Sequence, residues 1–323
     1  MKKLRTPILA PNAKNVSAAG QALLRGELIA FPTETVYGLG GDATNKLAIA
    51  KIFAAKDRPN FNPLIVHVKD AKQARDIVVF NNLADQLTEA FWPGALTLVL
   101  PRRNKQISLL VSAGLETLAV RAPNHCVAQA LLDNTGLPIA APSANRSGRI
   151  SPTEAGHVAS SLPSLENYGA AMILDGGPCQ IGVESTVVDL SDDLPTLLRP
   201  GGIATEDIEK VTGPLALPPC NKKESPRSPG MLDRHYAPDI SLRLEVTKPR
   251  PGEAFLAFGP NSSSENINLS PTGDLHEAAA NLFSMIRSLD RPPFTNIAVM
   301  PIPGHGLGCA INDRLRRAAK TKD

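Results

Sequence analysis

Two spacings of apolar residues alternate along residues 1–212 and predict an α/β domain. Apolar positions three or four apart, typical of amphipathic helices, occupy the segments Val16–Leu24, Leu47–Ala55, Ala71–Val78, Leu83–Phe91 and Val127–Leu132. Short apolar runs, typical of strands, occupy Leu28–Phe31, Leu64–Val68, Leu96–Leu100, Thr117–Arg121, the region near Ile139, Met172–Leu174, Ser185–Leu190 and Leu197–Leu198. Strands outnumber helices late in this region, which favours a twisted, open, mixed sheet packed by helices over a strictly repeating βαβ arrangement.

Proline interrupts the periodic pattern through residues 213–238, and a second α/β pattern follows. The expected strands are Ser241–Val246, Ala254–Phe258 and Asn296–Met300, and the expected helices are Asp274–Leu289 and Asn312–Ala319. The sequence therefore predicts three parts, namely a large domain over residues 1–212, a proline-rich linker over 213–238 and a small α/β domain over 239–323.

The composition excludes several classes of protein. Of the 323 residues, 42% are hydrophobic, which is enough to bury a core and too many for wholesale disorder. The net charge of +3 is too small for a dedicated nucleic-acid or membrane-surface protein, and 4% aromatic residues argue against a base-stacking platform. Any basic site is therefore expected to be local.

The cysteines and the apolar runs predict a cytoplasmic protein that does not contact membranes. Cys126, Cys179, Cys220 and Cys309 form no Cys-x-x-Cys pair, so we interpret them as isolated thiols in a reducing compartment. No apolar run approaches the ~18 residues that a membrane-spanning helix needs.

Common catalytic motifs are absent from the chain. Because no Gly-Lys dipeptide occurs, the Walker phosphate loop is excluded. Residues 38–43 fit the dinucleotide pattern G-x-G-x-x-A, but they lie several positions beyond their strand, which disfavours that reading. There is no G-x-S-x-G elbow, and His276-Glu277 lacks the second histidine of a zinc-protease motif.

Polar clusters follow several predicted strands, where open α/β sheets bind ligands. The cluster at residues 31–40 offers hydroxyls and glycines, although a glycine-rich turn with solvated threonines explains it too. The cluster at 56–64 holds Lys56, Arg58 and Asn62, which suit a triphosphate, but helix capping by the two cations is the favoured alternative on spacing alone. On the same grounds, His67 in the next strand is more typical of a core histidine.

Two later clusters add hydroxyls and a further cation. Residues 138–148 place Ser143 and Asn145 in a proline-braced turn, which an Asx or Ser turn would explain equally well. Residues 175–187 place Ser185 at the start of one strand, and Arg199 ends the next. Several cations, many hydroxyls and no obvious covalent nucleophile are typical of phosphoryl or nucleotidyl chemistry, where catalysis is chiefly positioning and charge stabilisation.

These segments resemble a known family. Pro32-Thr-Glu-Thr-Val-Tyr-Gly-Leu, Lys56-x-Arg58-Pro-x-x-x-Pro-Leu and Ala141-Pro-Ser-Ala-Asn145 are similar to the motifs of the YrdC/Sua5 threonylcarbamoyl-AMP synthases. The resemblance continues through Glu184-Ser-Thr-Val, crosses the linker in Arg234-His-Tyr-Ala-Pro238 and ends in Asn312-Asp-Arg-Leu-Arg-Arg-Ala, as in full-length Sua5-type members. One departure is Leu232-Asp233, where many relatives carry lysine and an aromatic residue.

The resemblance implies a YrdC-like fold with a small Rossmann-like second domain, and it implies a reaction. L-threonine, bicarbonate and ATP, with Mg²⁺ carried on the phosphates, would give threonylcarbamoyl-AMP and pyrophosphate for a downstream tRNA-modifying threonylcarbamoyl transferase machinery. Residues expected in catalysis are Lys56, Arg58, Ser143 and Asn145. Residues expected on the threonine side are Thr35, His67, Arg121, Ala141 and Ser185. Residues expected on the ATP side are Arg58, Asn62, Thr117, Ser143, Ser151, Arg199 and Tyr236.

Three other interpretations stay open at this point, together with a hypothesis about the linker. The first domain could be an RNA-binding module with no synthase activity, and weak tRNA contact is compatible with either function. Carbamoyl transfer of the kind found in hydrogenase maturation proteins is disfavoured, because those proteins carry zinc-type cysteine pairs that this chain lacks. The second domain could be purely structural, and residues 213–238 could close over the site as a lid.

Overall fold

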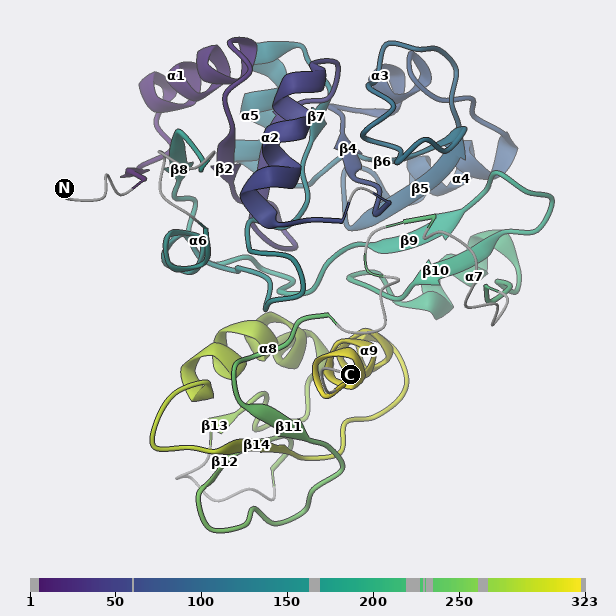
Figure 1. Ribbon diagram of the computed structural model, residues 1–323. Helices are drawn as coiled ribbons and strands as arrows, with labels where there is room; N and C mark the ends of the chain where they lie inside the picture. Colours follow the sequence, from purple (N-terminus) through teal and green to yellow (C-terminus); the bar gives the residue numbers. More distant parts are fainter. Residues whose placement is uncertain are drawn as a thin grey trace.

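The computed structural model describes residues 6–59, 61–162, 169–218, 227–228, 230, 235–260 and 267–320. Among these residues a ten-stranded sheet forms one domain and a four-stranded sheet forms a second, smaller one. Figure 1 shows the two sheets in separate bodies, with helices α8 (Leu275–Leu289) and α9 (Leu307–Ala318) of the small domain facing the large one. Residues Cys220 and Leu232-Asp233 lie outside the described part of the chain.

The large sheet is mixed, as the sequence predicts. Within this sheet, strands β2 and β3 are antiparallel, whereas strands β4 and β6 are parallel. In spatial order its strands are β1 (Ile8–Leu9), β8 (Met172–Leu174), β2 (Ile29–Phe31), β3 (Gly38–Asp42), β7 (Ile139–Ala140), β4 (Ile65–His67), β6 (Thr117–Arg121), β5 (Leu96–Pro101), β9 (Thr186–Asp189) and β10 (Thr196–Arg199). Its helices are α1 (Ala13–Leu24), α2 (Lys46–Lys56), α3 (Ala71–Arg75), α4 (Asn82–Phe91), α5 (Cys126–Thr135), α6 (Ala155–Ser161) and α7 (Thr205–Thr212).

Strand β3 corrects the reading of the glycine-rich segment. No strand was expected at residues 38–42, and the glycines of the 31–40 cluster were interpreted as a turn or as backbone open to a ligand. These residues instead form a fully buried strand between β2 and β7. Glycine is required there because a Cβ on Gly40 would lie 2.6 Å from Cε1 of Phe31 and 2.9 Å from a methyl group of Ile139. This strand placement, rather than a strand-to-helix turn, excludes the dinucleotide motif.

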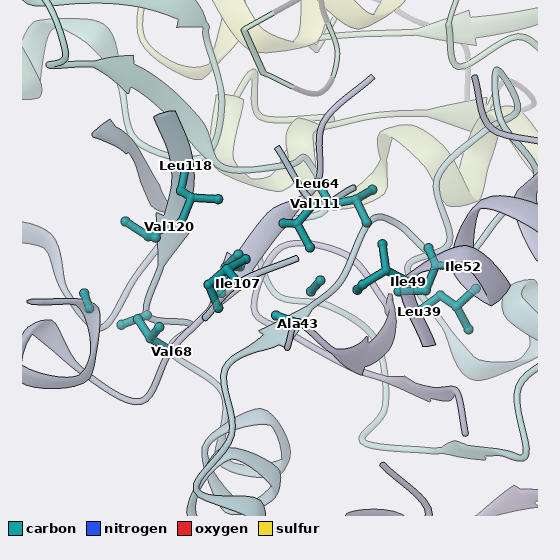
Figure 2. Close-up of a cluster of buried hydrophobic side chains, with 14 of the residues drawn as sticks. Leu39, Ala43, Ile49, Ile52, Leu64, Val68, Ile107, Val111, Leu118 and Val120 are labelled. Carbon is teal, nitrogen blue, oxygen red and sulfur yellow. The ribbon is translucent and has the colours of Figure 1, made fainter. Parts of the chain in front are cut away.

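Helix α2 packs on this glycine strand and builds the main core. Its first turn is capped by Asn45, whose side chain accepts hydrogen bonds from the amides of Leu47 and Ala48. Figure 2 shows Ile49 and Ile52 of α2 beside Leu39 of β3, within a cluster that extends to β6. Each of these fully buried aliphatic side chains contributes ~1.5–3 kcal/mol, so the core fixes the strands whose ends carry the polar clusters.

The small domain has the α/β character that the sequence predicts. Its parallel sheet runs β11 (Ser241–Arg243), β14 (Asn296–Val299), β12 (Glu253–Ala257) and β13 (Ile267–Asn268). Helix α8 begins after Asp274, whose carboxylate accepts from two amides of the first turn. Helix α9 begins earlier than expected, at Leu307, because its first turn packs into the same core.

The two domains pack closely against each other. Val36, Ile150 and Val183 of the large domain belong to the hydrophobic cluster of the small one. Gly182 allows this approach, because a Cβ there would lie 2.4 Å from the carbonyl oxygen of Ala279 in α8. None of the described helices has the length and apolar character that crossing a membrane requires.

Candidate active site

A small cavity of about 50 Å³ lies where the predicted polar clusters converge. It has room for only a few water molecules. Its polar walls come from the end of β2, strand β4, the ends of β6 and β7, the start of β9 and the end of β10. The predicted residues that line it are Thr35, Arg58, His67, Arg121, Ala141, Ser143, Ser185, Arg199 and Tyr236.

Thr35 and Arg121 are joined by a short chain of hydrogen bonds. The Thr33 hydroxyl donates to the carbonyl of Val36 (2.7 Å) and therefore accepts from the hydroxyl of Thr35 (2.8 Å). Nη1 of Arg121 donates to Thr35 Oγ1 (2.9 Å), and its Nε donates to the carbonyl of Gly94 (3.1 Å). These contacts fix both side chains in the cavity wall.

Glu34 is a buried partner of Arg121 that the sequence analysis did not single out. Its Oε1 lies 2.6 Å from Nη2 of Arg121, and both side chains are almost fully buried. The pair leaves Glu34 Oε2 without a hydrogen-bond partner in the described structure. The sequence signal was the adjacency of Glu34 to Thr35, but nothing in the sequence brings it to a residue on β6.

His67 is a neutral member of this wall. Burial, together with the charge of Arg121, lowers the pKa of His67 to about 3. The ring lies edge-on to Phe31, and its Nδ1 has no hydrogen-bond partner among the described residues. His67 is therefore an uncharged cavity histidine with one free nitrogen.

Besides Arg121, which pairs with Glu34, two further guanidinium groups line the cavity. Arg58 donates to the carbonyls of Asn62 (3.0 Å) and Pro63 (2.7 Å). Arg199 donates to the carbonyl of Ser185 (2.9 Å) and to its hydroxyl (3.2 Å). Burial and the neighbouring charge of Arg199 lower the pKa of Arg58 to about 9, and burial lowers the pKa of Arg199 as well. An anion between them would relieve this repulsion.

Lys56 lies behind the cavity and braces one of its loops. Its side chain is buried, and its ammonium donates to the carbonyls of Ser143 (2.6 Å) and Asn145. Burial and the charge of Arg58 lower its pKa well below the usual value. The expected helix cap is not formed, because the ammonium reaches across to another segment.

Four other predicted residues also lie outside the cavity lining. Asn145 donates to the carbonyls of Arg146 (2.8 Å) and Arg149 (2.9 Å), and so shapes the same loop as Lys56. Asn62 is fully buried, and neither polar atom of its amide has a partner among the described residues. Thr117 lies at the opposite end of β6 from Arg121. Ser151 reaches the cavity through Glu184, which accepts from its hydroxyl (2.5 Å).

The linker completes the wall and packs against the second domain. Gly230, His235 and Tyr236 of the linker line the cavity. The ring of Tyr236 stacks on Phe283 of α8 (5.5 Å between centroids), and its hydroxyl is buried without a hydrogen-bond partner among the described residues. Burial raises the pKa of Tyr236 to about 12, so it is a neutral phenol.

Glu184 is the acidic residue of the cavity lining. Burial alone would raise the pKa of its carboxyl, but the charges of Arg314 and Arg199 lower it to about 2. Its Oε2 accepts from Nε of Arg314 in α9 (3.0 Å). No group of three or more His, Cys, Asp or Glu side chains is arranged to hold a metal ion within the described ranges.

Comparison with known proteins identifies the family. The family model described as telomere recombination, which covers Sua5, YciO and YrdC proteins, matches residues 21–201. A second model, the threonylcarbamoyl-AMP synthase C-terminal domain, matches residues 203–320. The chain belongs to the Sua5/YrdC family. The resemblance drawn from the sequence motifs is therefore confirmed, and so is the YrdC-like fold.

Full-length relatives share both domains. The threonylcarbamoyl-AMP synthase of Bacillus subtilis is 42% identical over 97% of this chain and 95% of its own. The synthase of Pyrococcus abyssi is 40% identical over 94% of each chain. The crystal structure of P. abyssi Sua5 with L-threonine matches with a TM-score of 0.87 and 37% identity, covering 98% of this chain and 97% of that one. The crystal structure of Escherichia coli YciO shows the same fold over 62% of this chain, at 23% identity and a TM-score of 0.54.

Proposed function

We propose that this Sua5/YrdC protein is an L-threonylcarbamoyl-AMP synthase. It joins L-threonine, bicarbonate and ATP into threonylcarbamoyl-AMP and pyrophosphate, and so supplies threonylcarbamoyl-adenosine modification of tRNA. Its full-length relatives carry that name, and P. abyssi Sua5 binds L-threonine. One observation carries the proposal in the structure: the cations Arg58 and Arg199 share a single buried cavity with Thr35, His67 and Arg121.

The chemistry needs no nucleophile from the protein. The amine of threonine attacks the carbon of bicarbonate, and loss of water leaves a carbamate. A carbamate oxygen then bonds to the α-phosphorus of ATP, the bond to the β-phosphate oxygen breaks, and pyrophosphate leaves with that electron pair. The protein supplies orientation and fixed charge, which is typical of phosphoryl-group chemistry.

The residues assigned to ATP include the two cations Arg58 and Arg199. Arg58 and Arg199 neutralise the triphosphate, Ser143 binds it through its hydroxyl, and Lys56 with Asn145 holds the Ser143 loop in place. The remaining residues assigned to ATP are Asn62, Thr117, Ser151 and Tyr236. The buried, unpartnered amide of Asn62 and phenol of Tyr236 support this assignment, since both groups retain free hydrogen-bonding capacity.

The residues assigned to threonine are neutral, like His67, or paired with an opposite charge, like Arg121. Arg121 binds the substrate carboxylate, with Thr35, Ser185, His67 and the backbone at Ala141 completing the subsite. Glu34 holds Arg121 by its second nitrogen and so orients the guanidinium. A neutral His67 suits a small zwitterionic substrate, because it adds no charge that would compete with Arg121 for the carboxylate.

Magnesium belongs to the nucleotide in this proposal. The carboxylate of the cavity lining, Glu184, is already engaged by Ser151 and Arg314, so the walls fit a magnesium ion held by ATP phosphates better than a protein cage. The ion neutralises phosphate charge when it is bound.

Residues 213–238, with Tyr236, act as a lid between residues 1–212 and 239–323. The cavity of about 50 Å³ is far smaller than the ~300–1,000 Å³ of pockets that hold sizeable ligands, so substrates enter only when a wall moves. Tyr236→Ala should then release the adenylate, a hydrolysable mixed anhydride, faster than the wild type in a filter-retention assay. Unchanged retention in that variant, or in a chain ending at Gly213, would rule out the lid.

The decisive experiment measures pyrophosphate release from magnesium-ATP by the full chain. Release should require both L-threonine and bicarbonate, and mass spectrometry should detect the adenylate. Arg199→Met should abolish release, whereas Arg291→Met, which removes an exposed arginine of the second domain, should leave it unchanged. ATP turnover independent of threonine would contradict the proposal, as would salt-sensitive RNA binding without turnover.

A further inference from the structure

An arginine of the second domain contacts the wall of the nucleotide site. Arg314 on α9 is among the largest fully buried side chains of the described structure, at 1% exposure. Its Nε donates to Glu184 Oε2 (3.0 Å), and its Nη1 donates to the carbonyl of Pro200 (2.7 Å). Glu184 lines the cavity, and Pro200 directly follows Arg199. One guanidinium therefore joins two segments of the other domain.

Each of those two segments contacts or contains a residue assigned to ATP. Glu184 accepts from Ser151 through the carboxylate oxygen that Arg314 does not hold. The turn after Arg199 packs on the same region, because the amide of Gly202 donates to the carbonyl of Glu184 (3.0 Å). Holding Glu184 and Pro200 together therefore sets the separation between Ser151 and Arg199.

Arg314 also sets the charge of that wall. Without Arg314, the buried carboxylate of Glu184 would face an incoming triphosphate with only the charge of Arg199 to offset its own. Asp313 further fixes the guanidinium, accepting from Nη1 at 2.9 Å. Cζ of Arg314 also lies 5.3 Å from the ring centroid of Tyr236, so the same guanidinium contacts the linker.

We propose that Arg314 is a positioning residue of the nucleotide site, through which the second domain aligns Ser151 and Arg199 and neutralises Glu184. The inference rests on the assignment of ATP to this side of the cavity. It makes the second domain a structural half of the active site rather than an accessory. A chain lacking that domain would leave the Glu184 carboxylate beside the phosphates without its arginine partner.

The test measures the affinities of ATP and L-threonine separately by calorimetry, with the full chain. Arg314→Met should weaken ATP binding tenfold or more and change threonine binding less than threefold. Adding Glu184→Gln to Arg314→Met should restore at least threefold of the lost ATP affinity, because it removes the uncompensated charge. Arg316→Met, on an exposed face of the same helix, is the matched control and should change neither affinity.

Arg314→Lys serves if the methionine variant does not fold. Lysine keeps the charge but lacks the planar fork, so it cannot hold Glu184 and Pro200 together, and ATP binding should weaken about threefold to tenfold. Equal losses for both ligands, an unchanged ATP affinity in either Arg314 variant, or no rescue by Glu184→Gln would overturn the proposal. Because binding is measured without turnover, these results are independent of whether the wild type releases pyrophosphate.

Discussion

Replacing Lys56 distinguishes three possible roles of its ammonium: bracing the Ser143 loop for catalysis, acting on substrate, and stabilising the fold alone. In Lys56→Met the buried ammonium disappears while most of the apolar stem remains, so the carbonyls of Ser143 and Asn145 lose their donor. Hydrogen bonds from a charged donor are worth ~1.5–3 kcal/mol each, and the relief of a buried charge offsets part of the two. We therefore expect a net destabilisation of about 3 kcal/mol.

The loss should appear in both stability and turnover. For a domain of this size, about 3 kcal/mol corresponds to a fall in Tm of roughly 6–12 °C. Because the Ser143 loop loses its brace, kcat/KM for ATP should fall by ~10²-fold or more. Calorimetric melting and steady-state pyrophosphate release measure the two effects on the same preparation.

Lys51→Met is the matched control for this experiment. Lys51 lies on the same helix, and its ammonium also donates to a backbone carbonyl, that of Gly26 (2.7 Å), away from the cavity. It should lose stability without losing turnover. If turnover fell in Lys56→Met while the Tm stayed unchanged, the ammonium of the wild type would act on substrate rather than on the loop. If the Tm of Lys56→Met fell while turnover stayed unchanged, the role of Lys56 would be purely structural.

Two further predictions concern the threonine subsite. Arg121→Ala should raise the KM for threonine at least tenfold more than the KM for ATP, and equal effects on both constants would refute its assignment to the substrate carboxylate. Since the pKa of His67 is lowered to about 3, the ring is deprotonated from pH 8 down to pH 5, and the KM for threonine should show no transition near pH 6.5. Such a transition in the wild type that is absent from His67→Asn would show that the ring does charge.

Regular elements were predictable where packing and local pattern agree. Strands Thr117–Arg121 and Met172–Leu174 have the expected bounds, because each is a short apolar run buried in the sheet. Strand β3 was missed because glycine has low strand propensity, and only the ring of Phe31 above Gly40 explains its sequence. Helices α6 and α7 were missed because each is short and buries few side chains.

The sequence predicted residues that line the site, but not which side chains contact one another there. The motifs placed Arg58, Ser143, Ser185 and Arg199 around one cavity. Ser143 follows β7, Ser185 precedes β9 and Arg199 ends β10 of the same sheet, whereas Arg58 follows helix α2. They could not show that Lys56 turns toward a loop, because a lysine at a helix end has the same local sequence in either role. Direction of a side chain is set by tertiary packing, which composition and spacing do not encode.

Charge pairing across domains is the largest gap between sequence and structure. Glu184 and Arg314 are 130 positions apart, and each alone resembles a solvated surface residue. Only close packing makes the pair necessary, since Gly182 brings α8 against the large domain and both charges are then buried together. A buried charge must be compensated where it lies. Arg199 of the large domain supplies part of that compensation, and the direct ion pair comes from Arg314 on α9 of the second domain.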